Sequence, residues 1–177
     1  MPNYGFKANF SMGDVHNTFA DYAARVHRAT VKVLQYIGEQ CVKLAREKGT
    51  YNDITGNLRN SIGYVLVKNG SIISKNFEAK VESKLYVTTT GKGKKEKTVE
   101  PNNGTKGILE GEALAVELAS RVNKGYALIV VAGMHYAHYV ETLNKDVLDS
   151  AERWANEQVP RLMQRLKTQV YNTTMSK

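Results

Sequence analysis

The densest group of chemically active side chains lies in one short stretch near the end of the central third of the chain. His135, His138 and Glu141 follow one another at intervals of three residues. On a helical turn, two imidazoles at this spacing could lie together as metal ligands, but a metal site needs at least one more ligand, and Glu141 is the nearby candidate. As an acid–base catalyst, Glu141 has no partner carboxylate at a recognisable spacing.

The alternative to chemistry is a contact surface. Tyrosine and histidine combine an apolar ring with a polar tip, which suits an interface that is half buried and half wet. His135, Tyr136, His138 and Tyr139 would then flank a core strand and form hydrogen bonds across it or to another subunit. The chain has no phosphate-binding glycine motif, nucleophile elbow, paired cysteines or metalloprotease signature. We therefore expect no enzyme activity, catalytic residues, metal ligands or cofactor.

The element directly before these residues is an apolar run from Tyr126 to Ala132. Gly125 precedes it and Gly133 follows it, and β-branched residues fill its middle. That pattern is typical of a strand buried on both faces. We expect this strand to be the central one of the sheet, with the ring-rich residues at its end.

Three helices are predicted from apolar residues that recur every three or four positions. The first spans about residues 14–48 with Asp14 as its N-cap, the second about 107–123, and the last about 146–169. Pro160 lies inside the last helix and predicts a kink or a break. The first helix is long for a domain of this size, so part of its apolar stripe is expected to pack on another subunit.

A hairpin supplies the remaining strands. Ile62–Lys68 alternates in side-chain character, Asn69-Gly70 is a strong hairpin-turn signal, and Ser71–Phe77 is the returning strand. A short helical piece with Thr55 or Asn57 as cap precedes it. The expected fold class is α+β: a small, mainly antiparallel sheet packed against a long N-terminal helix and a C-terminal helix, with a helical insertion.

The 177 residues allow one domain, expected at residues 14–170, between an arm at 1–13 and a tail at 171–177. Tyr4, Phe6 and Phe10 are candidate docking anchors in the arm. The net charge is +8, so an anionic neighbour such as nucleic acid or an acidic protein face is plausible. Residues 88–107 form a glycine- and lysine-rich stretch, predicted as a flexible loop, whose candidate contacts to DNA or an acidic partner are Lys92, Lys94, Lys95, Lys97 and Lys106. No apolar run is long enough to cross a membrane, and no membrane partner is expected.

Two segments carry a resemblance to a known family. Thr55–Ile62, read TGNLRNSI, resembles the TG-x-L-x-x-S-I step of the head–tail joining, or tail-completion, proteins of long-tailed bacteriophages. Ala132–Glu141 resembles the strand of the same family that ends in Y-A-x-Y-V-E. The expected order of elements is similar too, over roughly residues 14–166. The family pattern differs after Glu141, where this chain continues with Thr142-Leu143-Asn144, and the region from about 78 to 123 is longer than in compact members.

The resemblance implies a structural protein of the virion neck, assembled in the host bacterial cytoplasm. It implies a homo-oligomeric ring, with a hexamer favoured over a dodecamer, between the portal–adaptor complex and the tail-terminator or tail-tube proteins. Genomic DNA in the channel would be a non-specific neighbour. The subunit or partner contacts expected on this basis use Tyr4, Phe6, Phe10, His135, Tyr136, His138, Tyr139 and Glu141. The alternative is a non-enzymatic, basic accessory protein that binds nucleic acid through its lysines.

Overall fold

The computed structural model describes residues 9, 11–53, 55–78 and 105–175. Its elements are α1 (Met12–Lys48), α2 (Asn57–Asn60), β1 (Ile62–Lys68), β2 (Ser71–Asn76), α3 (Thr105–Ala119), β3 (Tyr126–Ala132), α4 (Ala137–Thr142) and α5 (Asp149–Met175). The sheet is antiparallel, with strand order β2-β1-β3. Helices and this sheet form one α+β fold, as the periodicities predict.

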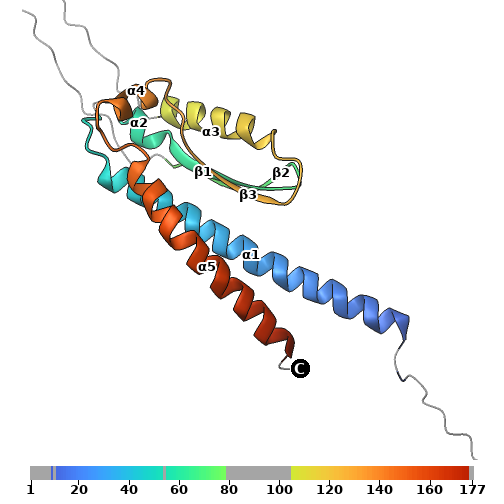
Figure 1. The fold of residues 1–177 in the computed structure, drawn as a ribbon. Coiled ribbons are helices and arrows are strands. Elements are labelled where there is room, and N and C mark those ends of the chain that lie inside the picture. Colours follow the sequence, from blue (N-terminus) through green and yellow to red (C-terminus); the bar gives the residue numbers. More distant parts are fainter. Residues whose placement is uncertain (1–8, 10, 54, 79–104, 176–177) are drawn as a thin grey trace, which may run out of the picture.

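The sheet lies between two helical layers (Figure 1). On one face Tyr64 of β1 joins Ile37 and Cys41 of α1 and Ala151 of α5 in a core cluster. The opposite face packs on α3, where Val65, Val67 and Val131 meet Ala115 and Ala119. Because neighbouring residues of a strand point to opposite faces, both sides of the alternating β1 pattern are buried.

The central strand is β1, not the apolar run that the sequence favours. Ile62 of β1 pairs with Ala132 of β3, and Lys68 pairs with Tyr126, while the other edge of β1 pairs with β2. β3 is only partly buried along most of its length. Its continuous apolar sequence has a different cause: α1 and α5 contact one face and α3 contacts the other.

The hairpin and the helix ends refine the predicted boundaries. Asn69 and Gly70 have φ values of 50° and 82°, as the predicted two-residue turn requires. The N-cap of α1 is Ser11 rather than Asp14, which instead completes a capping box with Ser11. Gly56, not Thr55 or Asn57, is the N-cap of α2. The last helix continues to Met175, and Pro160 does not break it.

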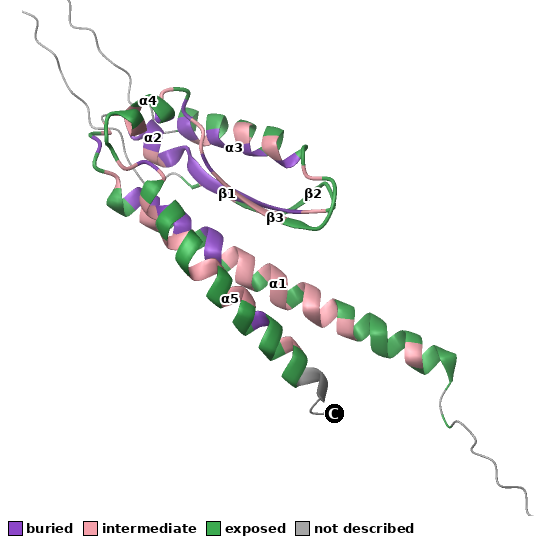
Figure 2. Cartoon of the chain, in the orientation of Figure 1, coloured by how far each residue is buried: buried purple, intermediate pink, exposed green. Residues whose placement is uncertain are grey.

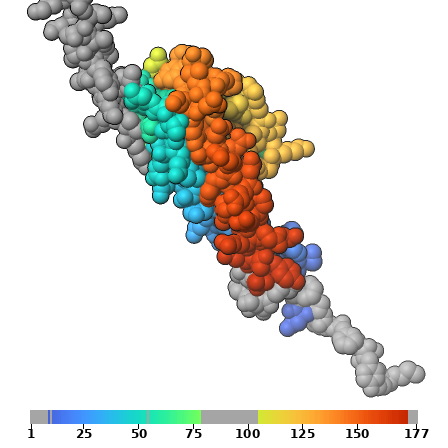
Figure 3. Space-filling view, turned by 60° about the vertical axis from the view of Figure 1, so that its left-hand side comes forward, coloured from blue at the N-terminus to red at the C-terminus, as the bar shows by residue number. Residues whose placement is uncertain are grey.

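α1 and α5 form a long antiparallel pair that extends away from the sheet. The thiol of Cys41 lies 4.0 Å from the carbonyl oxygen of Ala151, which fixes their register. Figure 3 shows α5 running as one ridge along the elongated molecule. The N-terminal half of α1 is largely exposed, as Figure 2 shows in green. No helix in the described part of the chain is long and apolar enough to span a bilayer.

Candidate assembly surfaces

The two segments that carry the family resemblance meet at one junction, which we call the Ser61 junction. The Ser61 carbonyl oxygen accepts a hydrogen bond from the Gly133 N–H at 3.2 Å, and its Oγ accepts one from the Met134 N–H at 3.3 Å. The Ser61 hydroxyl donates to the Leu58 carbonyl at 2.8 Å. Ser61 is fully buried. This serine therefore joins the end of α2 to the turn that follows β3.

Arg59 of the same segment ties the junction to the end of α1. Its guanidinium donates to the carbonyl oxygens of Arg46 at 2.5 Å and Gly49 at 3.0 Å, and it lies 5.0 Å from the ring centroid of Tyr51. These carbonyls are at the C-terminus of α1, where helical partners are lacking and a cation is favoured by the helix dipole. Arg59 is thus committed to backbone groups of its own chain.

Helix α3 approaches the junction through glycines. A Cβ on Gly107 would lie 2.1 Å from the Asn57 carbonyl oxygen, and one on Gly111 would lie 2.4 Å from that of Ser61. A Cβ on Gly133 would lie 2.3 Å from the Gly111 Cα. Only glycine fits these three places, because the neighbouring atoms belong to the backbone. Sequence reasoning missed these contacts, although three glycines in and near predicted elements were the visible signal.

The predicted contact residues of the opening stretch lie on α4 and the turn before it, not at the end of a strand. The Ala137 N–H donates to the Met134 carbonyl at 2.8 Å, and helix α4 follows from Ala137. The residues 135, 138 and 139 are exposed, and Tyr139 retains 65% of its accessible surface. Tyr136 is half-buried, and burial raises the pKa of its phenol, followed by the charge of Asp53.

The group His135, His138 and Glu141 does not come together as a ligand set. Among the described residues, no three His, Cys, Asp or Glu side chains lie together in a geometry that could hold a metal ion. The Glu141 carboxylate accepts a hydrogen bond from the Leu148 N–H at 3.0 Å. Its observed contact therefore fixes the connection between α4 and α5, while His135 packs edge-on against Tyr136 at 5.2 Å.

A second polar group fastens α1 to the far end of the sheet. His27 Nδ1 lies 2.5 Å from the Tyr126 hydroxyl and 3.4 Å from Lys68 Nζ, and Lys68 lies 5.4 Å from the Tyr126 ring centroid. Lys68 and Tyr126 are also paired residues of β1 and β3. The group pins the helix across the paired strand ends. It provides neither a nucleophile with an adjacent carboxylate nor a set of metal ligands.

The cavity beside β2 is polar and already satisfied internally. It has a volume of about 570 Å³ and lies between α1 and the hairpin. Glu39 accepts hydrogen bonds from the Tyr64 hydroxyl at 2.9 Å and the Asn76 amide at 2.8 Å, and Gln35 donates to Ser74. These mutual contacts hold the hairpin on α1.

Several predicted contact residues lie outside the described part of the chain. They are the arm anchors Tyr4, Phe6 and Phe10 and the lysines Lys92, Lys94, Lys95 and Lys97. Lys106 is described and exposed in the first turn of α3. It begins a helix whose other charged residues are acidic.

Two separate apolar surfaces are exposed in the described part of the chain. The first, which we call the distal face, comprises Met12, Val15 and Phe19 near the start of α1; Met12 and Phe19 retain 70% and 68% of their surface. The second, the outer α3 face, comprises Leu109, Ala113 and Val116, with exposures of 63% for Leu109 and 49% for Val116. They belong to different layers of the fold (Figure 1). Exposed apolar groups of this kind mark candidate interaction sites.

Compared with known protein families, curated proteins and solved structures, the chain matches none of them.

Proposed function

We propose that this protein is a structural component of the neck of a long-tailed bacteriophage. In this role, copies of the chain form a ring that joins the portal–adaptor complex to the tail and surrounds the DNA channel. The ring is a hexamer, with a dodecamer as the alternative copy number. The protein acts by binding its neighbours, not by turnover.

The observation that carries the proposal is the Ser61 junction. The two segments that resemble the head–tail joining family are separated by about 70 residues in the sequence, yet they are joined by hydrogen bonds from Gly133 and Met134 to Ser61. Arg59 and Ser61 bond to backbone groups within the chain. Motif residues used in this way build a scaffold, which is what a structural ring subunit needs.

The two exposed apolar surfaces support the same reading. Head-to-tail contacts in a closed ring require two different, complementary faces on each subunit. The distal face and the outer α3 face are different surfaces on different elements. An additional surface, formed by His138 and Tyr139 of α4, is available for a different protein of the neck.

The test is the oligomeric state of the purified full-length chain. Light scattering after size exclusion, together with negative-stain images, should give one discrete ring with a central opening. A protein that remains monomeric at millimolar concentration, and forms no ring in the presence of portal and tail proteins, would refute the proposal. If such a monomer bound DNA with a steep salt dependence that Lys→Gln changes at positions 92, 94, 95 and 97 removed, the accessory-protein alternative would replace it.

A further inference from the structure

Helix α3 has an apolar stripe on its solvent side as well as on its buried side. Gly107, Gly111, Ala115 and Ala119 face the junction and the sheet. The outer α3 face carries its residues at positions 109, 113 and 116, a spacing that places them along one side of a helix. A helix that only covered a sheet would need a polar outer side. Within the described part of the chain nothing covers this stripe.

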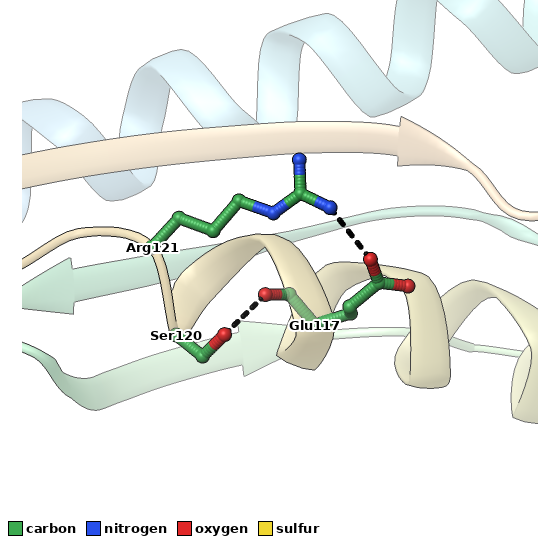
Figure 4. Close-up of polar contacts among 3 residues, drawn as sticks. All are labelled: Glu117, Ser120 and Arg121. Atoms are coloured by element: carbon green, nitrogen blue, oxygen red, sulfur yellow. Dashed lines mark hydrogen bonds and ion pairs between the residues drawn. The ribbon is translucent and has the colours of Figure 1, made fainter.

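Acidic side chains border the outer α3 face. The helix carries Glu110, Glu112 and Glu117 against Lys106, a net charge of −2 from three negative and one positive residues. Glu112 pairs with Lys75 at 3.1 Å, and Glu117 pairs with Arg121 at 2.7 Å, the pair drawn in Figure 4. Both pairs are largely exposed, and such pairs hold their partners by ~1 kcal/mol or less. Their carboxylates can therefore exchange to another cation.

The distal face continues a stripe that is buried further along the same helix. Met12, Val15, Phe19 and Val26 follow the three-and-four spacing that leads to Ile37 in the core. From the contact of Cys41 with Ala151, the antiparallel register places buried Leu166 of α5 beside about Val26. Phe19 lies beyond that pairing, which explains its 68% exposure on a stripe that is otherwise covered.

The charge around the distal face is opposite to that around α3. Residues 12–36 of α1 and 160–175 of α5 contain six basic and two acidic side chains, a net charge of +4. The basic residues are Arg25, Arg28, Lys32, Arg161, Arg165 and Lys167, and the acidic ones are Asp14 and Asp21. The positive excess of the chain is thus concentrated partly on the end of the molecule that carries Phe19.

We propose that the outer α3 face of one copy binds the distal face of the next copy, head to tail. The two surfaces match in length, since α3 and residues 12–26 of α1 each contain 15 residues and extend about 22 Å at 1.5 Å per residue. Ala113, a small residue between Leu109 and Val116, leaves room for the Phe19 ring. The acidic border of α3 faces the basic end of the helical pair. This contact rests on the proposed ring and specifies which surfaces close it.

The test uses two single substitutions and their mixture. Leu109→Asp disables the outer α3 face and leaves the distal face intact, whereas Phe19→Asp does the reverse. Each variant alone should lose the ring and sediment as a monomer, with a dissociation constant raised at least about thirtyfold, as for an interface hot spot. When the two variants are mixed, the intact α3 of one meets the intact distal face of the other. The mixture should form a one-to-one heterodimer that cannot grow.

Each outcome has a defined meaning for the contact. Both side chains are exposed, so circular dichroism melts should match the parent chain and exclude unfolding as the cause. Tyr36→Asp, a matched change at an exposed α1 residue outside the distal face, should leave the ring intact. Rings that survive Leu109→Asp or Phe19→Asp, or a mixture that stays monomeric, would overturn the contact but not the neck function. A parent chain that forms no ring would overturn both.

Discussion

Gly111 offers the sharpest test of how tightly α3 packs on the Ser61 junction. Replacing a helical glycine by alanine ordinarily stabilises a helix by up to ~1 kcal/mol. At position 111 the new Cβ would lie 2.4 Å from the Ser61 carbonyl oxygen, against 3.4 Å or more for an ordinary contact. The helix must therefore move by about 1 Å, away from backbone that cannot rotate aside. Overpacking of this kind costs about 1–3 kcal/mol.

We expect Gly111→Ala to lower the free energy of unfolding by about 2 kcal/mol, because the overlap exceeds the gain in helix propensity. For a chain of this size the melting temperature should fall by about 4–8 °C, measured by circular dichroism. Gly13→Ala is the matched control, since its Cβ would meet only the Ser11 Oγ, at 3.5 Å. That variant should be neutral or up to ~1 kcal/mol more stable. Equal stabilisation by both substitutions would show that α3 does not rest on the Ser61 backbone.

Three further predictions concern the junction and the cavity beside β2. Arg59→Ala should lower the free energy of unfolding in urea by about 2 kcal/mol, because the carbonyls that end α1 lose a charged donor; an unchanged midpoint would contradict this role. Ser61→Ala should cost about 1–3 kcal/mol and speed hydrogen exchange at the Met134 amide, which loses its acceptor, and unaltered exchange would argue against that bond. Burial, followed by hydrogen bonding to Glu39, raises the pKa of Tyr64 from 10.0 to about 12, so the folded state retains this proton more strongly. Its contribution is complete below pH 10 and is lost as the pH rises towards 12; urea titrations over that range should show a shallower loss for Tyr64→Phe, and parallel losses would refute the assignment.

Much of the fold follows from local patterns that tertiary packing leaves intact. The apolar period of α1 and α5 predicts both helices, and Asn69-Gly70 fixes the hairpin because two successive positive φ values suit these residues. The strand order could not be read this way. A run such as Tyr126–Ala132 is apolar wherever both its faces are covered, whether or not both its edges are paired.

The candidate surfaces were less predictable than the elements that carry them. The stripe on α1 has the same spacing at Phe19, which is exposed, as at Ile37, which is buried. Periodicity shows that a side needs a partner but not whether the partner is in the same chain. The residues after Gly133 were read as a strand end, yet the close approach of Gly133 to Gly111 coincides with the end of β3, and α4 follows. That approach is set by distant residues, so no local pattern contains it.

The continuity of α1 has a mechanical consequence. The helix has 37 residues, so it is a rod about 55 Å long, anchored near one end by Arg59 and along its length by His27. A tilt of only about 5° at the anchored end would displace Met12 by about 5 Å, roughly one helical turn. Small repacking at the junction is thus magnified at the far tip. The angle between neighbouring copies in an assembly would be set by the glycine contacts under α3 as much as by the side chains that touch.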